Sequence, residues 1–85
     1  MARGSELLTT KARILLYLER NGPARGTRIA RAIGSSLSAV YAALRELRAA
    51  GLVERNELAY GITEEGRRAL QHLREEIAEP AEARG

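Results

Sequence analysis

Residues 27–51 read TRIARAIGSSLSAVYAALRELRAAG and contain two helical patterns joined by a very short turn. Thr27 can cap the first helix, and Gly34 ends it. Ser36 can cap the second helix, which we expect to span residues 37–50. Apolar residues at helical spacing predict the buried sides, Ile29, Ala30 and Ile33 in the first helix and Leu37, Val40, Leu44 and Leu47 in the second. A short helix joined by a tight turn to a longer one is a helix-turn-helix candidate.

Patterns on both sides of this unit predict further elements. Upstream, Ile14 and several leucines at helical spacing indicate a helix over residues 9–21, with Thr9 or Thr10 as its cap and a Gly-Pro pair that stops it. Downstream, residues 52–55 and 58–62 have an extended pattern on either side of Asn56 and Glu57. We expect a hairpin there, with a turn of two residues or slightly more. The fold class is therefore mainly α with a small β-hairpin, a winged helix-turn-helix with a three-helix core and a wing.

A last helix is expected over about residues 64–78, with Thr63 as its cap and Pro80 as its end. Residues 1–79 would then form one winged-helix domain, followed by a disordered tail over residues 80–85. A chain of 85 residues has room for a single hydrophobic core.

The composition favours binding over catalysis. The chain has no Cys and no Asp, and His72 is its one histidine. Thiolate chemistry, catalytic triads and metal sites of Cys or paired His are therefore excluded, and we expect no catalytic residue, metal or cofactor. The longest apolar run, residues 14–18, is far shorter than a membrane span, and the chain start lacks an apolar signal core. These features predict a cytoplasmic protein with no membrane partner.

Positive charge is concentrated in the first part of the chain. The net charge is +3, with +6 on residues 1–50 and −3 on residues 51–85, and all cations but Lys11 are Arg. This asymmetry predicts one face that binds a polyanion and another face with a different role. The alternative explanation is a GC-rich or thermophilic genome that favours Arg, Ala and Glu everywhere.

Two blocks of sequence carry a family resemblance. Residues 36–54, SLSAVYAALRELRAAGLVE, resemble the recognition helix and first wing strand of winged-helix regulators of the PadR, MarR and archaeal Lrs14-like group. Residues 60–70, YGITEEGRRAL, resemble the return strand and the Thr-x-x-Gly start of the next helix. The resemblance implies a homodimeric transcription regulator that lays residues 37–50 in the DNA major groove. The wing is short and lacks Arg or Lys at its tip. We expect no attached small-molecule domain, so any effector would bind at a dimer interface.

The expected DNA contacts come from the start of the recognition helix and from the arginines around it. Ser and Ala can contact base edges, and guanidinium groups pair with phosphates. Tyr41 either packs or donates its hydroxyl to a phosphate. Because this helix has no Asn, Gln or Lys, much of any specificity should come from DNA shape. The predicted DNA-binding residues are Arg25, Arg28, Arg31, Ser35, Ser36, Ser38, Ala39, Tyr41, Ala42, Arg45, Arg48 and Arg55.

A second set of residues predicts a homodimer. The last helix has an apolar stripe that a three-helix core is too short to cover fully, and the first helix is apolar over a wide arc. Packing within one chain is the alternative. The predicted interface residues are Leu8, Leu16, Tyr17, Leu70, Leu73 and Ile77.

These observations predict a homodimeric, nucleoid-associated regulator of transcription that binds double-stranded DNA by sequence or by shape. The alternative is a winged helix that contacts proteins within a transcription or replication assembly. Loss of duplex binding on replacing Arg28 or Arg45 by Ala would separate the two functions.

Overall fold

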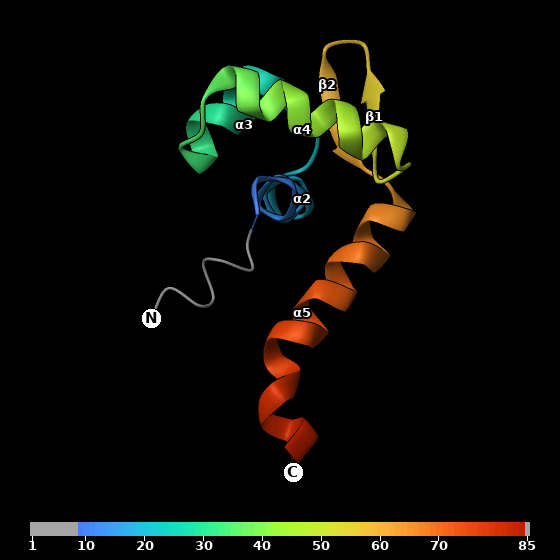
Figure 1. Ribbon diagram of the computed structural model, residues 1–85. Coiled ribbons are helices and arrows are strands. Elements are labelled where there is room, and N and C mark those ends of the chain that lie inside the picture. Colours follow the sequence, from blue (N-terminus) through green and yellow to red (C-terminus); the bar gives the residue numbers. More distant parts are fainter. Residues whose placement is uncertain (1–8, 85) are drawn as a thin grey trace.

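The computed structural model describes the backbone of residues 9–84 and the side chains of residues 9–75. Within that range the elements follow in the order α2 (Thr10–Asn21), α3 (Gly26–Ile33), α4 (Leu37–Ala49), β1 (Val53–Asn56), β2 (Ala59–Ile62) and α5 (Glu64–Arg84). The two strands form an antiparallel hairpin beyond one end of α4, and α5 runs away from the other elements (Figure 1). This is the winged helix-turn-helix fold that the sequence predicts.

Capping side chains fix the starts of three helices, as predicted. Thr9, Ser36 and Thr63 each accept a hydrogen bond from the backbone N–H three residues further on, at 3.3, 3.1 and 3.0 Å. The start of α3 differs from the prediction, because Arg25 has the extended backbone of an N-cap and its side chain makes no capping bond. Thr27 therefore lies inside the first turn of α3 rather than capping it.

The core lies between α2, α3 and α4 and is closed by the hairpin and the first turns of α5. Its fully buried large side chains are Ile14, Leu18, Ile29, Val40, Leu44, Leu47 and Leu70. Leu37 departs from the predicted buried stripe, since its side chain is 44% exposed. It stands in the first turn of α4, one turn before Val40, which is the first residue of α4 that the core buries.

The turn of the wing lies one residue further along the chain than predicted. The strand pairing leaves Glu57 and Leu58 as the two turn residues, instead of Asn56 and Glu57. In this register the hydrogen bonding continues past the hairpin, because the Thr63 N–H donates to the Leu52 carbonyl at 3.0 Å. The wing is thereby fixed at its base to the start of α5.

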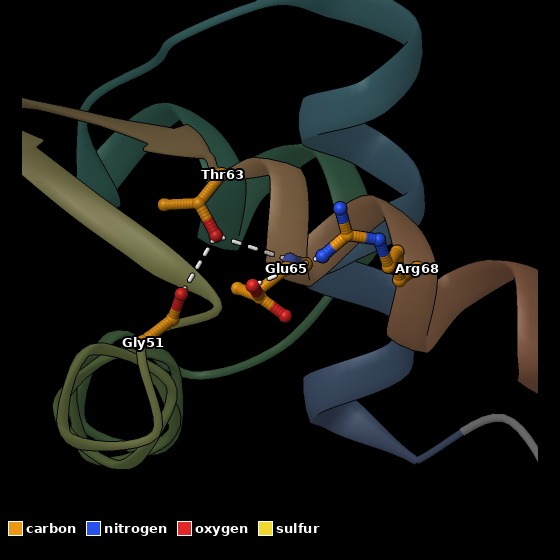
Figure 2. A network of polar contacts seen from close by, with 5 residues as sticks. Gly51, Thr63, Glu65 and Arg68 are labelled. Atoms are coloured by element: carbon orange, nitrogen blue, oxygen red, sulfur yellow. Dashed lines mark hydrogen bonds and ion pairs between the residues drawn. The ribbon is translucent and has the colours of Figure 1, made fainter.

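Thr63 also joins the end of α4 to the start of α5. Its hydroxyl donates to the Gly51 carbonyl at 2.7 Å and accepts the Gly66 N–H (Figure 2). In the same turn, Arg68 pairs with Glu65 at 3.0 Å. The Thr-x-x-Gly pattern seen in the sequence is therefore a helix cap that also holds the preceding loop.

The last helix continues past its predicted end. The sequence predicts an end near residue 78 and a disordered tail from Pro80, whereas α5 runs to Arg84. The residues on both sides of Pro80 are mainly Ala and Glu, which favour helix and oppose the effect of a proline that removes one backbone donor and crowds the carbonyl four residues earlier. Among the residues that the structure describes, no helix is both long and apolar enough to span a membrane.

Candidate nucleic-acid interface

The outward side of α4 is rich in small and uncharged side chains. Helical geometry places Ser38, Ala42 and Arg45 opposite the buried stripe, because they are about half a turn from it. The predicted contact residues on this helix are all exposed: Ser38, Ala39, Tyr41, Ala42, Arg45 and Arg48. The surface therefore offers few hydrogen-bonding groups and two guanidinium groups.

The two serines before α4 have different surroundings. Ser36 is exposed, but its hydroxyl oxygen is the cap of α4 and lies 3.4 Å from the Ser38 hydroxyl. Ser35 is half-buried, and its N–H donates to the Ala30 carbonyl at 3.0 Å. Of the three serines predicted to contact DNA, Ser38 is the one whose side chain neither caps the helix nor lies half-buried in the turn.

Tyr41 packs, which was one of the two roles predicted for it. Its ring meets the ring of Tyr60 edge-on, with the centroids 6.3 Å apart. On its other side it lies so close to Gly26 that a Cβ there would be 2.5 Å from the Tyr41 Cζ atom. Tyr41 therefore joins α4, the start of α3 and the wing. The sequence signal for this contact is the glycine that opens α3.

A groove runs between the start of α3 and the wing. Ala24 and Tyr60 exchange two backbone hydrogen bonds, at 3.0 and 2.8 Å, so the loop before α3 pairs with β2. The groove beside this pairing has a volume of about 610 Å³. Its lining residues are Pro23, Ala24, Arg25, Thr27, Arg28, Arg31, Ala32 and Ala59. The structure thus brings three of the predicted arginines to one groove, and no acidic residue lines it.

The remaining predicted arginines lie on α4 and on the wing. Arg45 and Arg48 are exposed on α4, outside the groove. The Arg55 Nε atom donates to the Glu57 carbonyl at 2.8 Å, which fixes this side chain to the wing turn. Among the described residues, the ion pairs involve none of the arginines of the groove or of α4.

One acidic residue, Glu46, lies on α4, and its charge is neutralised by α2. The Lys11 Nζ atom lies 2.7 Å from a carboxylate oxygen of Glu46. The hydrogen bond from Lys11 and its positive charge hold the pKa of Glu46 below its usual value, and the charge of Arg45 acts in the same direction. Among the described residues, Glu46 forms its ion pair with Lys11 and not with Arg45.

The residues predicted for a dimer interface fall into four groups. Leu16 and Tyr17 are half-buried and line a smaller groove of about 270 Å³ between α2 and α3. Leu73 is half-buried against the core. Leu70 is 1% exposed and belongs to the core of its own chain, so its assignment to an interface is wrong. Two further predicted residues have side chains outside the described part of the structure, namely Leu8 and Ile77.

The fold and the site together define a class: a winged helix-turn-helix protein with arginines gathered beside the first helix of the motif. A family model described as the MarR family matches residues 5–60, so the chain belongs to the MarR family. Members of this family are DNA-binding regulators of transcription rather than enzymes.

Two crystal structures are similar to this chain. Ligand-free NadR matches with a TM-score of 0.76 and 24% identity, over 96% of this chain and 63% of NadR. Rv1404 from Mycobacterium tuberculosis matches with a TM-score of 0.71 and 29% identity, over 96% of this chain and 64% of its own. The chain thus spans a little under two thirds of the length of either structure. No curated protein sequence matches it significantly.

Proposed function

We propose that this chain regulates transcription by binding double-stranded DNA as a homodimer, with α4 in the major groove. The observation that carries the proposal is the groove of Arg25, Arg28 and Arg31, which has no acidic residue in its lining. An exposed cluster of guanidinium groups beside a helix of small residues suits a phosphate backbone next to a groove of bases. Such a protein acts at the nucleoid.

Each element has a separate role in this proposal. The arginines of α3 pair with phosphates and set the orientation of the protein, while Ser38, Ala42 and Arg45 face base edges. Because few of these side chains form directional bonds to bases, DNA shape contributes to site selection. About four to six phosphate contacts per protomer give a slope of log K against log salt of about −4 to −5, doubled in a dimer.

Replacing single arginines tests the DNA-binding function. Arg28→Ala and Arg45→Ala each remove one exposed guanidinium that has no ion-pair partner among the described residues. We expect each to weaken duplex binding by about 1–2 kcal/mol and to reduce the salt slope by about one unit per protomer. Fluorescence anisotropy with sites selected from a random duplex pool, at several salt concentrations, measures both quantities.

Arg67→Ala is the matched control. It removes the same charge from an exposed position on α5, so it corrects for the change in net charge. If Arg28→Ala and Arg45→Ala both bind duplex as the parent and Arg67→Ala do, DNA is not the ligand of this surface. A winged helix that contacts proteins in a transcription or replication assembly would then explain the surface better.

Two features support the homodimer. The helix α5 has 21 residues and projects away from the other elements (Figure 1). Of its described side chains, only Leu70 and Leu73 belong to the hydrophobic core or pack against it. Leu16 and Tyr17 leave a partly apolar groove on α2 that a second chain can fill.

A further inference from the structure

Leu37 is an apolar side chain at the N-terminal end of α4, the helix that the proposed function places in the major groove. It is the first residue of α4, and it is 44% exposed. The core does not need Leu37, because Val40, Leu44 and Leu47 already fill the buried side of the helix. Leu37 also lies outside the hydrophobic core cluster and is not among the residues packed against it.

We infer that Leu37 contacts the C5-methyl group of thymine in the major groove and makes this methyl group a determinant of the bound sequence. The inference rests on the proposed function. In B-DNA the thymine methyl is the apolar group that a base pair presents in the major groove, whereas the minor groove presents none. A leucine side chain therefore has one chemical feature of the bases to recognise there.

Most polar side chains around Leu37 make contacts within the fold, so few of them are free to form hydrogen bonds with bases. The Ser36 hydroxyl caps the helix, and the Tyr41 ring packs between Gly26 and Tyr60. At this end of α4, the Ser36 hydroxyl oxygen accepts a backbone N–H, whereas the Ser38 hydroxyl contacts only the Ser36 hydroxyl. Contacts with bases at this end of α4 are thus mainly apolar.

The arrangement of α4 extends the apolar surface along the groove. Leu37 and Tyr41 are four residues apart and lie on one row of the helix, and Ser38 and Ala42 form the next row. Ala42 is exposed and also suits a methyl group. The surface therefore has two apolar positions on neighbouring rows, of which Leu37 is the larger.

Removing the methyl group from the DNA tests the inference directly. A site selected from a random duplex pool is synthesised twice, once with thymine and once with deoxyuridine, which pairs identically but has no C5-methyl group. The parent protein is expected to prefer the thymine duplex by about fourfold for each contacted methyl, the factor that corresponds to burying one methylene-sized group. Anisotropy titrations of both duplexes give the ratio.

Three variants connect this preference to Leu37. Leu37→Ser is expected to bind the two duplexes with nearly equal affinity, and Leu37→Met is expected to keep the preference. Leu58→Ser is the matched control, because Leu58 is 57% exposed at the wing tip, away from α4, and its loss should leave the preference unchanged. Unfolding curves confirm that the variants fold, since neither leucine is part of the buried core.

The outcomes separate this inference from the proposed function. If the parent binds both duplexes equally, or if Leu37→Ser keeps the full preference, the inference is overturned and DNA binding stands. The same holds if the selected sites contain no thymine at a fixed position. If no duplex is bound above background, the proposed function fails and the inference fails with it.

Discussion

Gly66, in the first turn of α5, packs closely against the loop that precedes the wing. A Cβ at this position would lie 2.2 Å from the Leu52 carbonyl oxygen and 2.7 Å from Cγ1 of Ile62. The Leu52 carbonyl oxygen accepts a hydrogen bond from the Thr63 N–H. It therefore cannot move away without loss of the hydrogen bond that fixes the base of the wing. The glycine is required by this contact and not by its backbone angles, because Gly66 is an ordinary helical residue.

Gly66→Ala is therefore expected to destabilise the fold, although alanine is the better helix former. The helix alone would gain about 1 kcal/mol from the change. The overlap with Leu52 should outweigh this gain, for a net loss of about 2–3 kcal/mol in the free energy of unfolding. Urea denaturation followed by circular dichroism measures the loss.

Gly61→Ala is the control for that measurement. A Cβ at Gly61 would lie 3.5 Å from Cγ of Pro23, which is ordinary van der Waals contact. We expect a change within about 0.5 kcal/mol. A Gly66→Ala protein as stable as the Gly61→Ala protein would show that the start of α5 does not lie against the loop as described.

The wing turn holds the one non-glycine residue with a positive φ among the residues that the structure describes. Glu57 has a φ of 59°, in the left-handed region that non-glycine residues rarely adopt. Its carbonyl accepts the hydrogen bond from Arg55, which helps to hold the turn in this form. The stability of the wing thus includes a local cost at Glu57.

Glu57→Asn should stabilise the wing, because asparagine tolerates the left-handed conformation better than glutamate does. The expected gain is about 0.5–1 kcal/mol in the free energy of unfolding. Glu54→Asn, on an exposed position of β1, removes the same charge without this benefit and should be neutral or slightly destabilising. Thermal unfolding of the two variants beside the parent decides the matter, and equal shifts for both would contradict the expectation.

The elements of this fold were predictable to the extent that local chemistry determines them. Caps at Thr9, Ser36 and Thr63 are short-range signals, and the structure confirms all three. The positions that sequence reasoning missed depend on distant residues. The register of the wing is continued by the hydrogen bond between Thr63 and Leu52, and the start of α3 accommodates the ring of Tyr41.

In the candidate site, too, features with a local sequence signal were predictable and features that depend on distant residues were not. The arginines of α3 were found from their spacing and charge, and the structure gathers them in one groove. The exposure of Leu37 was missed because helical spacing alone assigns it to the buried stripe, whereas only the packed structure shows where that stripe begins. Leu70 was misassigned for the opposite reason, because the sequence does not show how far the core reaches along α5.

At the scale of the whole molecule, the extents of 46 × 27 × 21 Å show that the chain is elongated. The projecting α5 accounts for this shape (Figure 1). In a dimer held through α5, this helix is the part of each chain that its partner covers.

A chain shortened after Glu75 tests the role of the distal half of α5. The shortened chain keeps Leu70 and Leu73, the described residues of α5 that the core buries or contacts, so it should still fold. We expect the full chain to have twice its single-chain mass of 9.3 kDa in solution and the shortened chain to be monomeric. Light scattering at tens of micromolar measures the masses, and a melting temperature that rises with concentration only for the full chain supports the same conclusion.

Either of two results would contradict this prediction. A full chain that is monomeric at these concentrations removes the homodimer from the proposed function. A shortened chain that still dimerises assigns the contact to α2, where Leu16 and Tyr17 line the smaller groove.

The bonds of Thr63 to Gly51 and Gly66 make a stiff joint between α4 and a helix of 21 residues. Such a helix is about 30 Å long, so a tilt of about 5° at the joint moves its far end by roughly 3 Å. In the proposed dimer, a small displacement where the two copies meet would rotate each α4 relative to its own half-site. The Thr63 hydroxyl, through its bonds to Gly51 and Gly66, would then help to set the half-site spacing that the proposed dimer accepts.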